Sequence, residues 1–124
     1  MILNLSRVEM AVLSVNMAAL RKNVRKGFKS NFGKQEGQEK LEIYDEIKAA
    51  LNDGIEHTEE EQEKELHFNK NEIDMLNDFV PWYLLELEIT YEAAGKKLKG
   101  EDQQVIETLQ GIKEKIERVI ENYA

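Results

Sequence analysis

The sequence predicts an all-α protein, an antiparallel bundle of four principal helices, and three observations lead to this fold. Apolar residues recur at steps of three and four along most of the chain, which is the spacing of amphipathic helices. The 124 residues include one proline and no cysteine, so helices meet few interruptions and disulfides are excluded. A composition of 41% hydrophobic and 34% charged residues is typical of a globular protein. We expect a single helical domain, residues 1–124.

The helical spacing divides the chain into four segments, which are residues 6–27, 38–51, 69–98 and 101–123. In the first segment Met10, Leu13 and Met17 form one apolar stripe. A second stripe, which includes Val8 and Val15, lies beside it at the same spacing. We expect both stripes to be buried.

Glycine and proline residues mark the expected breaks between and within these helices. The segment Lys29–Gly37 is predicted to be a loop, because Gly27, Gly33 and Gly37 interrupt helices. Pro81 falls inside the third helix, where it removes a backbone hydrogen-bond donor. The apolar spacing keeps its phase on both sides of Pro81, so a kink is expected there rather than a break.

The chain also resembles itself. Residues 3–13 align with residues 66–76, and in both a Ser or Asn is followed three residues later by Glu. This spacing predicts a capping box at each helix start, one at Ser6 and one at Asn69. One hypothesis is therefore a duplicated αα-hairpin.

The duplication hypothesis has a structural consequence. Its pseudo-repeats are residues 1–56 and 66–124, joined by an acidic connector, residues 55–65. The segments Ile2–Leu5 and Leu66–Phe68 precede the two expected capping boxes, and we expect them to pair as a minimal two-stranded β ribbon.

Charge is distributed unevenly along the chain. The net charge is −8, yet residues 1–34 hold seven bases and one acid, whereas residues 35–78 hold fifteen acids and four bases. An acidic average argues against a protein that coats nucleic acid. A local basic segment remains, with Phe28 and Phe32 interleaved among its cations. These cations are Arg21, Lys22, Arg25, Lys26, Lys29 and Lys34.

The basic segment supports one alternative function. Its cations could neutralise phosphates while the aromatic rings stack on bases, so nucleic acid is one partner to consider. The structural interpretation is a solvated helix end whose charge is balanced by the acidic connector.

The aromatic residues around Pro81 give the best candidate for an interaction site. At helical spacing such residues are usually core, but Trp82 lies beside the main stripe rather than on it. The apolar surface is therefore wider than one neighbouring helix needs, and the excess favours a protein partner or a second copy. The predicted protein-interaction residues are Phe79, Trp82, Tyr83 and Leu85.

No catalytic, metal or cofactor motif is present in the sequence. The chain lacks a glycine-rich phosphate loop and a nucleophile elbow, so we expect no enzyme activity and no cofactor. His57 and His67 are its two histidines, and neither lies in a rigid set of metal ligands. The apolar run Val8–Leu20 contains Glu9 and is too short to span a bilayer. We therefore expect a cytoplasmic protein without a membrane partner.

These observations lead to a functional hypothesis and its alternatives. We expect a non-enzymatic interaction or regulatory protein that binds another macromolecule through its helical surface, with a homodimer as one arrangement. The first alternative is nucleic-acid binding through the basic segment. The second is an acidic inhibitor or immunity-type protein, whose carboxylates in Glu56–Glu65 occupy a basic site on a target protein. A further alternative is a small apolar ligand bound at the Pro81 kink.

Overall fold

The computed structural model describes residues 1–93, 95 and 100–123, and these form three helices and one two-stranded sheet. The elements in chain order are β1 (Ile2–Ser6), α1 (Arg7–Glu56), β2 (Glu63–His67), α2 (Lys70–Ala93) and α3 (Gly100–Tyr123). A mostly helical fold with a small β ribbon is thereby confirmed. The expected extension of the third helix to Leu98 lies outside the described residues. Within the described residues, no helix combines the length and the apolar character needed to cross a bilayer.

The two strands pair antiparallel, with Leu3 directly opposite Leu66. The pairing extends past β1, because the carbonyl of Met1 accepts a hydrogen bond from the amide of Phe68 at 2.9 Å. Side chains alternate between the two faces of a strand. The face that carries Leu3, Leu66 and Phe68 is buried, with at most 5% of each residue exposed. The ribbon therefore closes one end of the core.

The connector is shorter than expected, because α1 runs to Glu56 and β2 begins at Glu63 rather than at Leu66. Glu63 and Glu65 are exposed while Leu66 is buried, so the alternation of a strand already includes the acids. Charged residues on the outward face are common in edge strands, where they discourage further pairing. These residues are assigned to the connector from the sequence because acids are frequent there, so this part of the strand was not predicted.

Both expected capping boxes are present. The amide of Glu9 donates to Ser6 Oγ at 3.1 Å, and the amide of Ser6 donates to Glu9 Oε1 at 2.8 Å. Asn69 and Glu72 make the same two hydrogen bonds, each at 2.9 Å. The same spacing therefore produces the same helix start, one at α1 and one at α2.

The helix α1 consists of two helical arms joined at Gly33, whose φ of 83° and ψ of 176° are not helical. Glycine adopts a positive φ without a steric penalty, so one residue suffices to reverse the chain. The loop predicted over Lys29–Gly37 is wrong, because the residues on each side of Gly33 are helical. Gly37 is helical and buried, and a Cβ placed there would lie 2.9 Å from the carbonyl oxygen of Phe28. This glycine allows the two arms to approach closely.

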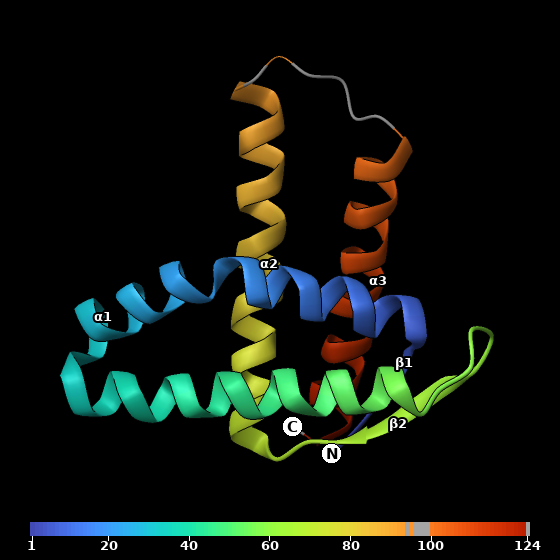
Figure 1. Cartoon of the computed structure of the whole chain (residues 1–124), viewed down its shortest axis with the longest axis horizontal. Helices are drawn as coiled ribbons and strands as arrows, with labels where there is room; N and C mark the ends of the chain where they lie inside the picture. The colour runs from blue at the N-terminus through green and yellow to red at the C-terminus, as the bar shows by residue number, and fades with distance from the viewer. Residues whose placement is uncertain (94, 96–99, 124) are drawn as a thin grey trace.

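The α1 hairpin lies across the hairpin formed by α2 and α3, and it contacts both helices (Figure 1). This arrangement differs from the aligned bundle that we expected. The period of the apolar residues indicates which face of a helix is buried, but not the angle at which two faces cross. The core lies at the crossing, and its largest fully buried side chains come from β1 and all three helices: Leu3, Leu5, Met10, Leu13, Met17, Tyr44, Ile47, Leu51, Ile73, Leu76, Leu109 and Ile112.

Only one of the two apolar stripes on the first arm of α1 is buried. Met10, Leu13 and Met17 are 0% exposed, whereas Val8 and Val15 are 59% and 66% exposed. The expectation that both stripes are buried is therefore wrong. The elements that cross α1 cover one face of this arm and leave the valines in contact with solvent.

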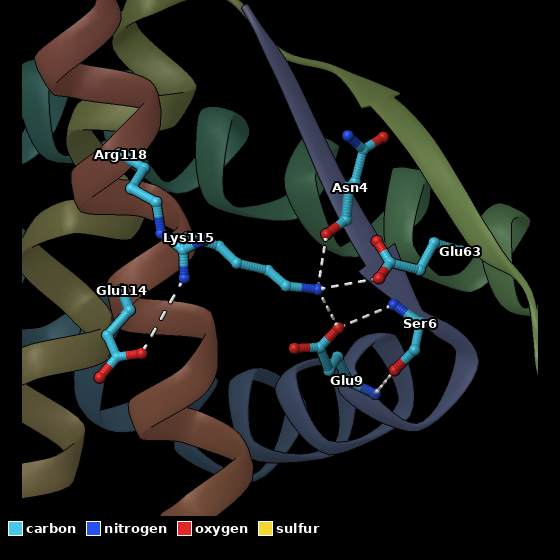
Figure 2. Close-up of polar contacts among 7 residues, drawn as sticks. All are labelled: Asn4, Ser6, Glu9, Glu63, Glu114, Lys115 and Arg118. Atoms are coloured by element: carbon cyan, nitrogen blue, oxygen red, sulfur yellow. Dashed lines mark hydrogen bonds and ion pairs between the residues drawn. The ribbon is translucent and has the colours of Figure 1, made fainter.

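Lys115 connects α3 to the ribbon and to the start of α1 (Figure 2). Its Nζ donates to the carbonyl of Asn4 at 3.0 Å and pairs with the carboxylates of Glu9 at 2.7 Å and Glu63 at 3.6 Å. The side chains of Lys115 and Glu9 are 25% and 15% exposed, so solvent and salt screen this pair less than a surface pair. Since Glu9 also caps α1, one carboxylate connects the junction of β1 and α1 to the middle of α3.

The close approach at Gly37 predicts opposite effects for two similar substitutions. Gly37→Ala places its Cβ against backbone atoms of Phe28 and Lys29 and should lower the free energy of unfolding by about 1–3 kcal/mol. Gly27→Ala meets nothing within 4 Å and should raise the free energy of unfolding by about 0.5–1 kcal/mol through helix propensity. Urea denaturation of both variants measures these changes. Equal stabilisation by the two would show that the arms do not meet at Gly37.

Candidate protein-interaction groove

A ladder of aromatic rings connects the turn end of α1, residues 23–44, to α2. Tyr44 packs edge-on against Phe28 and Phe79, with ring centroids 6.5 and 5.7 Å apart. Phe79 stacks on Tyr83 at 5.9 Å and is tilted against Trp82 at 6.0 Å. Tyr44 is fully buried, and this burial raises the pKa of its phenol. Aromatic pairs stabilise a core beyond the area that they bury, so the ladder holds the turn end of α1 against α2.

The four residues predicted to contact a partner divide into two pairs. Phe79 is 7% exposed and belongs to the core. Tyr83 is half-buried, and its hydroxyl donates to Asn16 Oδ1 at 2.8 Å, which joins α2 to the first arm of α1. Trp82 and Leu85 are 42% and 54% exposed. The helix α2 includes Pro81 without ending there, and only the second pair reaches the surface that a partner would contact.

A groove opens between the turn end of α1 and the first half of α2, where α1 extends past α2 (Figure 1). Its volume is about 760 Å³, within the usual size of binding clefts. Trp82 lines the groove whereas Leu85 does not. We call it the tip groove, and its apolar lining consists of Val24, Phe28, Phe32, Ile43, Tyr44, Met75, Phe79 and Trp82.

Carboxylates dominate the charged lining of the tip groove. Its charged residues are Glu36, Glu39, Asp74, Asp78 and Lys40. The ammonium group of Lys40 lies 4.4 Å from the ring centroid of Phe32, which is cation–π geometry. Within the described residues, none of the four carboxylates forms an ion pair with Lys or Arg. The groove therefore combines an apolar lining with a net negative charge.

The six predicted nucleic-acid-binding cations do not act as one set. Arg21 forms a bidentate pair with Asp45 on the second arm of α1, at 2.7 and 2.8 Å. Their hydrogen bond lowers the pKa of Asp45 and raises that of Arg21. The other five cations are exposed and do not line the tip groove, although residues between them in the sequence do. These five are Lys22, Arg25, Lys26, Lys29 and Lys34.

This separation changes the interpretation of the basic segment. Phe28 and Phe32 line the tip groove, whereas the five exposed cations do not. The acidic connector lies at the opposite end of α1 (Figure 1). Of the six cations, Arg21 pairs with Asp45 on the facing arm rather than with an acid of the connector.

The described residues that line the tip groove include no histidine, serine or cysteine, and its titratable side chains are the four carboxylates, Lys40 and Tyr44. Elsewhere among the described residues, no group of three His, Asp or Glu side chains is placed to hold a metal ion. His57 lies 3.4 Å from the carboxylate of Asp53, and both side chains are more than half exposed.

The carboxylates of the groove belong to the candidate site and were not predicted from the sequence. Asp74 and Asp78 lie one turn apart on α2, beside Met75 and Phe79 of the apolar stripe, and this pattern was available in the sequence. Glu36 and Glu39 reach the same groove only because α1 crosses α2 at its turn end. Helical periodicity does not contain that information.

Phe79 and Trp82 differ in burial, because Phe79 belongs to the core whereas the ring of Trp82 is partly exposed. Phe79→Ala should lower the free energy of unfolding by about 3–5 kcal/mol, because it removes a buried ring from the centre of the ladder. Trp82→Ala should cost clearly less, about 1 kcal/mol, because its ring is partly in solvent already. Chemical denaturation followed by circular dichroism compares them. A larger loss from Trp82→Ala than from Phe79→Ala would make Trp82 a core residue and not a contact residue.

Comparisons of the chain with models of protein families, with curated proteins and with solved structures found no match. Function must therefore be inferred from the shape and the charge of the tip groove.

Proposed function

We propose that this chain is a non-enzymatic protein of the cytoplasm that binds another protein through the tip groove. The observation that carries the proposal is the apolar lining of an open groove, in which Phe32 and Trp82 each leave 42% of their surface exposed. Large aromatic side chains in a recess are frequent hot spots of protein interfaces. The absence of cysteine is compatible with a reducing compartment.

A macromolecular partner fits this groove better than a small ligand. Small-molecule sites usually enclose most of the ligand surface, whereas the two most exposed aromatic rings of the tip groove remain accessible to solvent. Peptide segments bind in grooves of this kind by placing a row of apolar side chains against one wall. The aromatic ladder keeps the walls in place before a partner arrives, which lowers the entropic cost of binding.

Site-specific crosslinking tests the proposal. A photo-reactive phenylalanine analogue introduced at Phe32 should capture a partner in cells that make the native protein, because this side chain lies in the groove. The matched control carries the analogue at Leu85, which is 54% exposed but outside the groove. We expect a discrete crosslinked product at Phe32 and none at Leu85. The same product at both positions, or none at either, would contradict binding at the tip groove.

Nucleic-acid binding through the basic segment is a second candidate function. The observation that favours it is a set of five exposed cations on α1: Lys22, Arg25, Lys26, Lys29 and Lys34. Exposed lysine and arginine side chains on a helix can neutralise successive phosphates of one strand. Phe28 and Phe32 line the groove, so this candidate function rests on the cations alone.

A gel-shift titration across salt concentrations tests the second candidate. Reversal of two charges, Arg25→Glu and Lys26→Glu, should weaken binding roughly tenfold or more. It should also reduce the slope of log affinity against log salt by about two. Arg118→Glu on α3, whose side chain is 68% exposed, serves as the control and should change little. Affinity that is insensitive to both salt and the double reversal would exclude phosphate binding by this segment.

The duplication hypothesis remains a proposal about how the scaffold arose. Counting the arms of α1 separately gives four helical segments in two hairpins, and each hairpin begins with a capping box. Leu3 and Leu66, which the internal alignment equates, face each other in the ribbon, as a local twofold axis requires. Related chains should then show a stronger internal match, and its absence in them would contradict duplication.

A further inference from the structure

We infer that the occupant of the tip groove is a cationic amphipathic helix of a partner protein. This inference rests on the proposed function and adds the chemical class of the partner. It follows from the combination of an apolar lining with Glu36, Glu39, Asp74 and Asp78. A helix with apolar residues at steps of three and four, and with lysine or arginine between them, matches both properties.

The charges require cations from the partner. Lys40 is the one base among the described lining residues, and its ammonium lies over the ring of Phe32. A partner that covers the groove removes water from the carboxylates around it, which is costly unless they gain hydrogen-bonded cations. A neutral or acidic helix offers no such compensation. Lysine or arginine residues that flank the apolar anchors would provide the hydrogen-bonded cations that the carboxylates need.

The two walls define how such a helix would bind. Asp74 and Asp78 are separated by one turn of α2, with Met75 and Phe79 between and beside them. A partner helix can therefore insert its apolar side chains toward Met75 and Phe79 while its cations reach the carboxylates of α2. The carboxylates of Glu36 and Glu39 belong to the other wall, on the second arm of α1. Cations on both flanks of the apolar stripe are thus expected.

A second copy of this chain is a poor occupant. A symmetric contact of groove with groove would bring the four carboxylates of one copy against those of the other, and like charges repel. The exposed cations that the structure describes do not line the groove, so a symmetric dimer would not neutralise the carboxylates. A head-to-tail contact would place the exposed cations of one copy against the carboxylates of the next, but such contacts tend to propagate rather than to close.

Three synthetic peptides of about 18 residues test the inference with the full-length protein. All three carry leucine at steps of three and four, and their remaining positions are alanine with lysine, glutamine or glutamate. Trp82 is the only tryptophan of the chain and lines the groove, so its fluorescence reports binding directly. The double variant Asp74→Asn with Asp78→Asn removes two carboxylates. Glu86→Gln, on the exposed surface of α2 outside the groove, is the control.

We expect the lysine peptide to shift Trp82 emission to the blue and to bind at least about tenfold more tightly than the glutamate peptide at low salt. The double variant should weaken binding of the lysine peptide about threefold to tenfold, with little effect of Glu86→Gln.

Equal affinity of the lysine and glutamine peptides, or no effect of the double variant, would overturn the cationic partner and leave the groove as a binding site. If no peptide alters Trp82 emission, the cationic helix and the proposed groove function both fail. A free protein that sediments as a dimer with Trp82 shielded would assign the groove to a second copy and overturn the inference.

Discussion

The rest of the structure depends on the antiparallel register of β1 and β2, in which Leu3 faces Leu66. This short ribbon brings together two helix starts that are far apart in the sequence, and each start is completed by a capping box. Lys115 adds a third connection, because its ammonium reaches the ribbon and the carboxylate that caps α1. With both hairpins held at the ribbon, one buried face of each packs against the other where they cross. A slip of one strand by one residue would turn its buried leucine, Leu3 or Leu66, toward solvent.

Local features of this fold could be predicted from the sequence, whereas those that depend on how two elements meet could not. The capping residues, the ribbon and the stripe of Met10, Leu13 and Met17 follow from short-range spacing, which is set by helix and strand geometry. The reversal at Gly33 and the exposure of Val15 do not follow from short-range spacing. A glycine can break a helix, reverse it or let another helix approach, and only the neighbouring arm decides between these outcomes. The tip groove shows the same limit, since Trp82 was a candidate from its place on the helix while Glu36 and Glu39 join it through the crossing.

The crossing also explains why one helix presents two different surfaces. On the first arm of α1, Val24, Phe28 and Phe32 line the groove beside α2, whereas the exposed cations Lys22, Arg25, Lys26 and Lys29 do not. A hairpin aligned with α2 would have covered the first set. Because α1 extends past α2 instead, part of its apolar face remains open to solvent beside Trp82. The carboxylates of both walls, Glu36 and Glu39 on α1 and Asp74 and Asp78 on α2, surround this open part. The tip groove therefore arises from the angle between two hairpins rather than from a loop.

The central claim is that the groove exists in the free protein, with the turn end of α1 held at a fixed place over α2. The chain has no cysteine, so a pair of introduced cysteines accepts spin labels at two defined positions. Lys29→Cys and Glu86→Cys place labels on exposed positions of α1 and α2 that do not line the groove. The distance distribution from double electron–electron resonance should show a single narrow population without any partner. A broad or multiple distribution would show that the turn end of α1 moves freely, and would contradict a preformed groove.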